Sequence, residues 1–144
     1  MMSEPMRLIQ RLERAHVAQL HELYQHEWWT QGRTREDVER MRDGTTYVFG
    51  FCTDSDNRLV GFARVLTDGV FKGMIFDVIV ASPYRQTGLG ARLMNAILEH
   101  PVLRTVRHLE LYCLPEMVAF YEKWQFSTEV SGVKYMRRIV TSAR

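Results

Sequence analysis

The residues best suited to chemistry lie in a strand-to-helix turn that contains Gly88 and Gly90. The first amides of a helix have no partners within it, and with the helix dipole they form a binding site for an anion such as phosphate. Glycine at both positions leaves no Cβ in the path of a pyrophosphate. Arg85 and Arg92 add positive charge nearby. The sequence therefore predicts a phosphate-binding turn.

The hydrophobic pattern predicts the elements on either side of this turn. The run from Phe76 to Val80 is apolar on both alternating faces apart from Asp77, as expected for a central strand covered on both sides. Pro83 has no amide to donate, so the strand must end before it. Apolar residues then recur at three- to four-residue spacing from Leu89 to Ile97, which predicts a helix.

Three other interpretations of the glycines compete with this one. A Walker loop requires Gly-Lys-Ser/Thr, whereas Gly90 is followed by Ala91, so that motif is excluded. A dinucleotide fingerprint needs a third glycine or alanine where the chain has Leu93, although Glu110 lies near the expected acidic position. The glycines can also serve the backbone turn alone.

The segment Arg85 to Gly90, Arg-Gln-Thr-Gly-Leu-Gly, resembles the Q/R-x-x-G-x-G/A signature of the GNAT N-acetyltransferase superfamily. The strand before it and the segment Phe120 to Phe126 also resemble motifs of that family, and the resemblance covers roughly Leu59 to Phe126. It implies that the turn grips the pyrophosphate of acetyl-CoA, the co-substrate. The implied cofactor contacts are Val78, Ile79, Val80, Arg85, Gln86, Thr87, Gly88, Leu89, Gly90, Ala91 and Tyr121.

Acetyl transfer from a thioester to an amine requires removal of a proton, stabilisation of an oxyanion and return of a proton to the thiolate. The resemblance makes Tyr121 the residue that protonates the thiolate; the alternative is a tyrosine packed in a helix. Asp77 is the candidate general base, because burial raises a carboxyl pKa. Alternatively, Asp77 is a hydrogen-bonding anchor and a water chain carries the proton. Amides around Ile79 and Val80 are the candidate oxyanion donors.

An aromatic segment between the first two predicted helices contains Trp28, Trp29 and Arg33. In the GNAT family the corresponding segment borders the acceptor site. By that analogy the three residues bind substrate, with Arg33 suited to a carboxylate or phosphate. Tryptophans packed against the helix pair are the alternative. Because an aromatic loop can wall off a pocket, we expect a small-molecule primary amine as acceptor rather than a protein amine.

Two positions depart from the family pattern. Gln125 stands where the family usually has a glycine before Phe126, which affects the expected turn. Leu114 and Pro115 occupy the region where many members carry an asparagine that holds the pantetheine arm. Neither departure touches the predicted phosphate-binding turn.

The element order predicts an α/β (α+β) fold over one domain, residues 1–144. Predicted strands cover residues 6–10, 47–52, 59–66, 75–82, 106–113 and 133–140, and predicted helices cover 12–27, 34–42, 88–100 and 115–124. This is the GNAT topology in outline: a mixed, mainly antiparallel central sheet with helices on both faces and a parallel splayed strand pair.

Composition narrows the choice of partners and compartment. A net charge of +2 without a long basic run gives no reason to expect nucleic acid. Two cysteines, without Cys-x-x-Cys spacing, indicate a reducing cytoplasm, and no apolar run is long enough to span a membrane. Three histidines spaced five apart cannot converge on one metal from a helix. We therefore expect a cytoplasmic acetyltransferase without metal, with a homodimer implied by the family; a non-catalytic acyl-CoA-binding or sensing module is the alternative.

Overall fold

A computed structural model describes residues 4–140, and the chain divides after Leu111 into two compact units. The first unit holds a five-stranded sheet with the order β1-β2-β3-β4-β5. Neighbouring strands are antiparallel except for the final pair, β4 and β5, which is parallel. The strands are β1 Met6–Ile9, β2 Tyr47–Thr53, β3 Leu59–Thr67, β4 Lys72–Val80 and β5 His108–Glu110.

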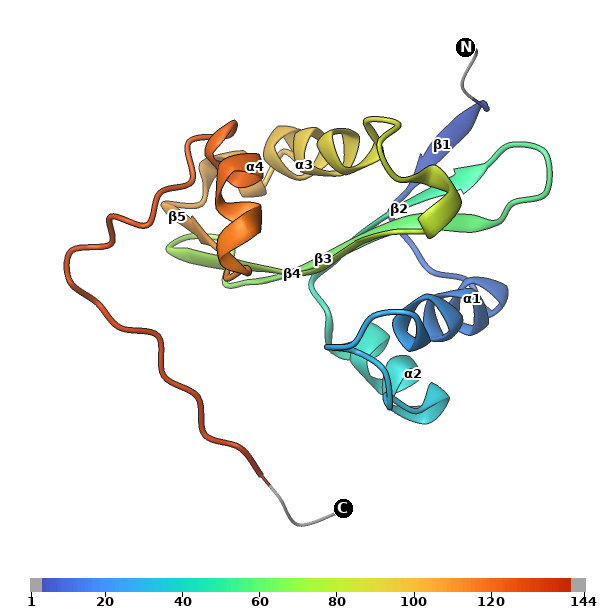
Figure 1. Cartoon of the computed structure of the whole chain (residues 1–144), viewed down its shortest axis with the longest axis horizontal. Coiled ribbons are helices and arrows are strands. Elements are labelled where there is room, and N and C mark those ends of the chain that lie inside the picture. Colours follow the sequence, from blue (N-terminus) through green and yellow to red (C-terminus); the bar gives the residue numbers. More distant parts are fainter. Residues whose placement is uncertain (1–3, 141–144) are drawn as a thin grey trace. The chain divides into compact units, whose positions relative to one another are not determined.

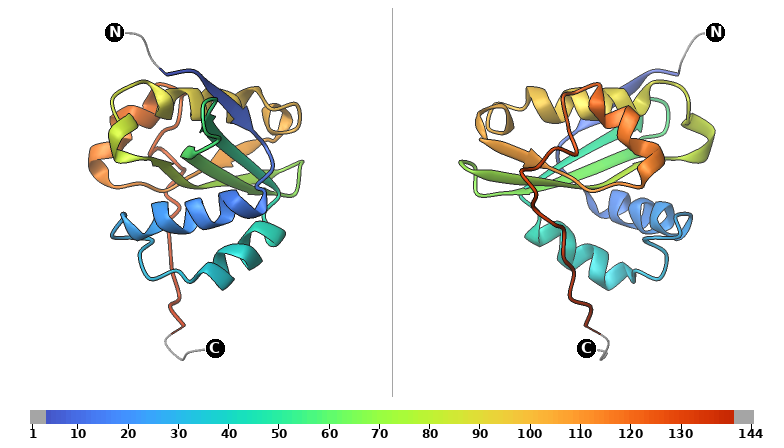
Figure 2. Two further views of the ribbon diagram at one scale, coloured as in Figure 1. Left: turned by 90° about the vertical axis from the view of Figure 1, so that its right-hand side faces the viewer. Right: turned by 60° about the vertical axis from the view of Figure 1, so that its left-hand side comes forward.

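Three α-helices belong to this unit, and they lie on both sides of the sheet (Figure 1). Helices α1, Arg14–Gln25, and α2, Arg35–Gly44, cover one face, and α3, Leu89–Glu99, covers the other (Figure 2). Short 3-10 helices occur at Ser82–Tyr84 (η1) and Leu103–Thr105. This architecture confirms the predicted fold class.

Each face of the sheet buries apolar side chains against its helices. On the α1 and α2 face the core includes Leu12, Val17, Leu20, Tyr24, Val38, Val48, Cys52, Leu59, Phe62 and Ile79. On the other face α3 lies close to β3. A Cβ added at Gly61 would lie only 3.1 Å from Leu89 Cδ2. Leu93 and Ile97 of α3 are completely buried there. The apolar spacing that predicted this helix therefore marks its core-facing side.

The parallel pair is short, and this leaves one edge of β4 open. Residues Lys72 to Met74 pair with His108 to Glu110, whereas β4 continues to Val80. In the described part of the chain no strand pairs with Ile75 to Val80 on that side. The predicted splayed pair is thus present, although β5 is much shorter than the predicted strand 106–113.

The second unit contains a 3-10 turn, Pro115–Met117, followed directly by α4, Val118–Glu122. The rings of Phe120 and Trp124 pack 5.0 Å apart in it, and those of Tyr121 and Phe126 lie 6.3 Å apart. These aromatic contacts lie in and just after the helix predicted at residues 115–124.

The prediction of a final strand at residues 133–140 is wrong. These residues form neither helix nor strand, and Met136 and Val140 are 88% and 72% exposed. A strand exists only through hydrogen bonds to a neighbour, and within residues 4–140 no strand pairs with this segment. The β-branched and aromatic residues of this segment favour a strand, but in that range the strand has no partner to pair with.

Among the described residues no helix combines the length and the apolar character that crossing a bilayer requires.

Replacing Leu93 with alanine should lower the free energy of unfolding by about 2–5 kcal/mol, because it leaves a cavity between α3 and the sheet. Urea unfolding measures this change. Glu99→Ala, at an exposed position of the same helix, is the control and should change it by less than about 0.5 kcal/mol. Equal effects of the two substitutions would contradict the placement of α3.

Candidate active site

The open end of β4 leads directly into the predicted phosphate-binding turn. After η1, the side chains of Arg85, Gln86 and Thr87 are exposed, and Gly88 begins α3 with a φ of +86°. A Cβ added at Gly88 would meet no atom within 4 Å, so the space beside this backbone is open. Gly88 therefore provides both a left-handed turn and an unobstructed surface.

The first amides of α3 have no side-chain cap. Thr34 caps the start of α2 by accepting a hydrogen bond from the Asp37 amide at 3.1 Å. In the part of the chain that the structure describes no side chain caps α3, and the first turn of α3 holds no acidic residue. The first helical hydrogen bond of α3 runs from the Arg92 amide to the Gly88 carbonyl. The amides of residues 89–91 are therefore left for a ligand, as an anion site requires.

Arg85 braces the turn. Its Nε donates to the Val80 carbonyl at 3.1 Å, and its Nη2 lies 2.6 Å from Glu27 Oε1, just after α1. Thr87 Oγ1 donates to the Tyr84 carbonyl at 2.5 Å. These contacts hold the turn against the end of β4 and the residue just after α1. The positive charge of Arg85, which we predicted to help bind the cofactor, is therefore paired with the Glu27 carboxylate.

A cleft of about 740 Å³ lies beside the end of β4. It is lined by residues 79–83 at and just after the end of β4, by residues of α1 and just after it, and by the turn between β2 and β3. The charged side chains that line it are Glu22, Glu27, Asp56, Arg58 and Arg85. The cleft thus places carboxylates beside the open end of the strand.

Asp77 is buried in a cluster of hydrogen-bond donors. Its Oδ2 accepts hydrogen bonds from Tyr24 Oη at 2.8 Å, Arg33 Nη1 at 2.8 Å and Arg64 Nε at 2.7 Å. Its Oδ1 accepts a longer one from Arg33 Nη2, at 3.4 Å. The side chain of Asp77 is only 4% exposed. A buried carboxylate therefore faces two guanidinium groups, one of them partly exposed.

This cluster sets the charge states of its members. Burial alone would raise the pKa of Asp77, but the hydrogen bond from Arg33 and the charge of Arg64 hold it below its usual value. Burial and the neighbouring Asp77 carboxylate raise the pKa of Tyr24, so the phenol stays protonated and donates. Asp77 is thus a charged, saturated acceptor, which favours the anchor interpretation over the general base.

The three predicted substrate residues, Trp28, Trp29 and Arg33, lie in different environments. Trp28 and Trp29 are 68% and 41% exposed, so they do not pack within the helix pair. Arg33 is tied to Asp77, and its guanidinium lies 4.6 Å from the centre of the Tyr24 ring. None of the three lines the cleft.

Tyr121 belongs to the second unit, where it lies in α4. The side chain is buried, and burial together with the nearby Cys113 raises the pKa of its phenol to about 12. It therefore stays protonated at neutral pH, as a proton donor must.

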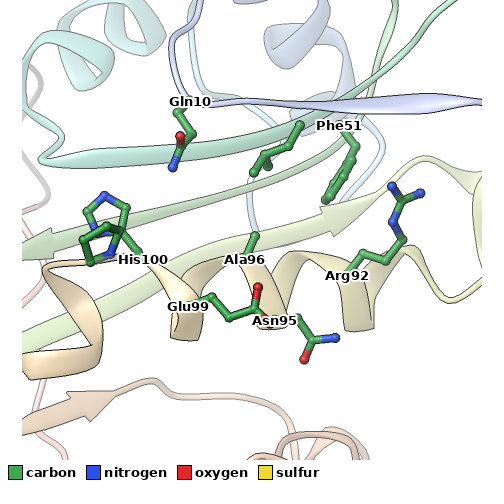
Figure 3. Close-up of a pocket in the computed structure, with 9 residues that line it drawn as sticks. Gln10, Phe51, Arg92, Asn95, Ala96, Glu99 and His100 are labelled. Atoms are coloured by element: carbon green, nitrogen blue, oxygen red, sulfur yellow. The ribbon is translucent and has the colours of Figure 1, made fainter.

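A second hollow lies on the α3 side of the sheet (Figure 3). The Arg92 guanidinium lies over the Phe51 ring there, 4.6 Å from its centre, and His100 lines the opposite end of the hollow. The charge of Arg92, which we predicted to lie near the phosphate-binding turn, thus lies over an aromatic ring on the α3 side of the sheet. Within the described residues, no group of three or more histidine, cysteine or acidic side chains is arranged to hold a metal.

Two important residues, Tyr24 and Arg64, were missed by the sequence analysis. Arg64 is the one charge within the apolar run 59–66, just as Asp77 is within the next strand. Two opposite charges isolated in adjacent strands of a predicted antiparallel pair are a signal for a buried ion pair. Nothing in the sequence distinguishes Tyr24 from the other apolar residues of its helix.

Comparison with known proteins identifies the family. The model of the Acetyltransferase (GNAT) family matches residues 9–126. The chain belongs to this family. A crystal structure of a GNAT acetyltransferase from Xanthomonas campestris has a TM-score of 0.79 and 25% sequence identity, and the match covers 96% of each chain.

The curated relatives carry several names. One from Porphyra purpurea, "Uncharacterized N-acetyltransferase ycf52", is 34% identical over 83 residues, which cover 58% of this chain and 48% of the relative. "Serotonin N-acetyltransferase 2, chloroplastic" of Oryza sativa is 28% identical over 110 residues, 73% of this chain and 55% of the relative. A Glycine max relative, 30% identical over 83 residues, 58% of this chain and 36% of the relative, is named "Histone acetyltransferase TAP1". The chain spans about half the length, or less, of these relatives.

Asp77→Asn should lower the free energy of unfolding at pH 7 by about 3 kcal/mol, because it leaves the guanidiniums of Arg64 and the partly exposed Arg33 without a counter-charge. The folded-state pKa of Asp77 is depressed, so its stabilisation is complete above the ordinary carboxyl pKa of about 3.9 and is lost as the pH falls through the lower folded value. The difference between variant and wild type should therefore shrink below about pH 4.

Urea unfolding across pH 2.5–7 tests this prediction. Asp43→Asn is the control, because Asp43 is 74% exposed and its pair with Arg42 should contribute less than about 1 kcal/mol. An Asp77→Asn protein as stable as wild type at pH 7 would show that the cluster is not a stabilising ion pair.

Proposed function

We propose that this chain is an acetyl-CoA-dependent N-acetyltransferase that moves an acetyl group directly to the primary amine of a small molecule. Membership of the GNAT family supports the reaction class. The observation that carries the proposal is the open end of β4, which runs into an uncapped helix start with free space beside Gly88. This combination suits a ligand with an extended arm and a diphosphate.

The residues of the turn fit coenzyme A. The amides of residues 89–91 would bind the pyrophosphate, since no side chain competes for them. Gly88 leaves the approach clear, and Gln86 and Thr87 border it with exposed side chains. Bound acetyl-CoA supplies the reactive thioester.

The end of β4 would bind the thioester through its main chain. The Ala81 amide donates to the Val60 carbonyl at 2.8 Å, so Ala81 and, two residues back, Ile79 direct their main-chain groups toward β3. Those of Val80 then point to the open edge. The Val80 amide is therefore our proposed oxyanion donor, rather than that of Ile79.

The cleft suits a small cationic amine. Its volume is in the range of small-molecule sites, and among the ion pairs of residues 4–140 Glu22 and Asp56 have no arginine partner such as Glu27 has. An amine arrives mostly protonated at neutral pH, so carboxylates at the mouth would attract it. The Oryza sativa relative is named for a small amine and the Glycine max relative for histone; the cleft favours the small molecule.

Proton transfers complete the proposed reaction. The amine proton would leave through water in the cleft, because Asp77 already accepts hydrogen bonds from three side chains and its pKa is lowered. Tyr121 would return a proton to the thiolate. Burial raises the pKa of this phenol, so it carries its proton at neutral pH and can give it to the departing thiolate as the carbon–sulfur bond breaks.

A cytoplasmic location, a homodimer and the lack of a nucleic-acid partner stay predictions. The Oryza sativa relative has a name that places it in the chloroplast.

Gly88→Asp should weaken coenzyme A binding about tenfold or more, because the new carboxylate would compete for the free amides and repel the pyrophosphate. Calorimetry measures the dissociation constant. Gly88→Asn is the matched control, since it has the same shape and tolerates a positive φ without adding charge. Pantetheine, which lacks the pyrophosphate, should bind the two variants equally; a Gly88→Asp protein that binds coenzyme A like Gly88→Asn would contradict the site.

Tyr121→Phe should lower kcat by about 10²-fold while coenzyme A affinity stays within about threefold, because only proton donation is removed. Release of free thiol, screened over amino acids, polyamines, amino sugars, arylalkylamines and peptides, measures turnover. Since the phenol has a pKa of about 12, wild-type activity should not fall through its ionisation below about pH 11.

Tyr135→Phe, in the exposed C-terminal segment, is the control and should leave kcat unchanged. Unchanged turnover in Tyr121→Phe would remove Tyr121 as the acid. Coenzyme A binding without transfer to any amine would instead favour an acyl-CoA sensing module.

A further inference from the structure

The pairing of β3 with β4 is interrupted at Asp77. Phe62 lies opposite Ile79, and Arg64 lies opposite Phe76, so two residues of β4, Asp77 and Val78, stand opposite the single residue Ala63 of β3. The additional residue makes a β-bulge, and Asp77 within it has a φ of +57°. That backbone conformation is unfavourable for a residue with a Cβ, so neighbouring contacts must hold it.

The bulge reverses which main-chain groups reach the open edge. Phe62 and Arg64 lie on one face of β3, so their partners Ile79 and Phe76 share that face although they are three residues apart. A regular strand with Phe76 in the same place would put Val78 opposite Phe62 and Ile79 opposite Gly61. The Ile79 amide would then point to the open edge in place of the Val80 amide.

The cluster around Asp77 fastens the bulge from three directions. Arg64 comes from β3, and Tyr24 comes from α1. Arg33 comes from the loop after α1, where its side chain is 32% exposed. All three donate to the carboxylate of the bulged residue itself, so their charge and hydrogen bonds act on the conformation of that residue.

We propose that the Arg33–Asp77–Arg64 cluster is a positioning device that holds the β4 bulge and thereby selects Val80 as the amide presented at the open edge. The proposal rests on the proposed acetyltransferase function, in which that amide binds the thioester carbonyl. Asp77 and Arg33 are then positioning residues, and they act through the backbone of β4 without contacting either substrate. The loop that carries Trp28 and Trp29 is joined to the thioester-binding strand through Arg33.

The test compares Asp77→Asn and Arg33→Met with the control Arg35→Met. Asparagine keeps the shape of Asp77 and its tolerance of a positive φ but removes the charge. Arg33→Met removes a partly exposed partner, so it remains informative where Asp77→Asn does not fold. Arg35 is exposed on α2 and pairs only with Glu39 among the ion pairs of the described residues, at 3.9 Å.

The first readout is amide hydrogen exchange by NMR on the protein without ligand. In wild type and Arg35→Met we expect protected amides at Ile79 and Ala81 and fast exchange at Val80. In the cluster variants protection at Ile79 should fall at least about tenfold as the strand loses its bulged register. This readout needs no turnover, so it holds even if no acetyl acceptor is found.

The second readout separates kcat from KM. Misplacing one oxyanion donor should lower kcat at least about tenfold, whereas KM for acetyl-CoA should stay within about threefold because the phosphate-binding turn is intact. Arg33→Lys, which keeps the charge but loses the bidentate contact, should recover part of kcat.

Two outcomes overturn the proposal. One is that the cluster variants keep the wild-type protection pattern and the kcat of Arg35→Met. The other is that they lose thermal stability and activity together while Ile79 and Ala81 remain protected and Val80 exchanges fast, which makes the cluster purely stabilising. A wild-type protein with no acetyl transfer, but with the expected shift in protection, would refute the proposed function and leave the register claim standing.

Discussion

The buried carboxylate of Asp77 is the interaction on which the site depends. It lies within hydrogen-bond distance of donors from helix α1, the loop after it and strand β3, so it joins three parts of the first unit to β4. Taking one carboxylate and two guanidiniums from water is unfavourable unless their geometry compensates, and here three donors converge on one oxygen. A small displacement of Asp77 would weaken several of these hydrogen bonds at once. The cluster therefore fixes the position of the end of β4.

Two features with unpaired main-chain groups follow Asp77 along the chain. The end of β4 keeps an open edge because β5 stops at Glu110, and α3 begins without a side-chain cap. Exposed edges and uncapped helix ends are normally avoided or covered, since their main-chain groups seek partners. Finding both in succession, at an exposed turn with a glycine, is best explained by a ligand that satisfies both, and coenzyme A has the shape and charge to do so.

The local features of this site could be predicted from the sequence. Pro83 and Gly88 mark a strand end and a helix start through backbone constraints that do not depend on the rest of the fold. The order of helices and strands along the chain followed from hydrophobic periods and short connections. These rules need only neighbours along the chain, so they succeeded from β1 to α3.

Other features depend on contacts between distant residues, and the sequence analysis missed them. In the sequence Asp77 is a lone carboxylate in an apolar strand, and burial would raise its pKa. The structure places Arg33 and Arg64 beside it, and these two charges lower the pKa instead. The bulge leaves no mark in the apolar alternation, because residues on both faces of a central strand are apolar. Residues 133–140 show the opposite error: a strand pattern predicts a strand only if another strand is available to pair with it.

An NMR titration of coenzyme A into the isotope-labelled protein tests the central claim most directly. If β4 and the turn bind the cofactor through their main chain, the amides of Val80, Leu89, Gly90 and Ala91 should shift together and saturate at one dissociation constant. The amides around Asn95 and His100, on the α3 side of the sheet, should shift far less. Shifts confined to that second hollow, or no saturable shift at Val80 and the start of α3, would contradict the account.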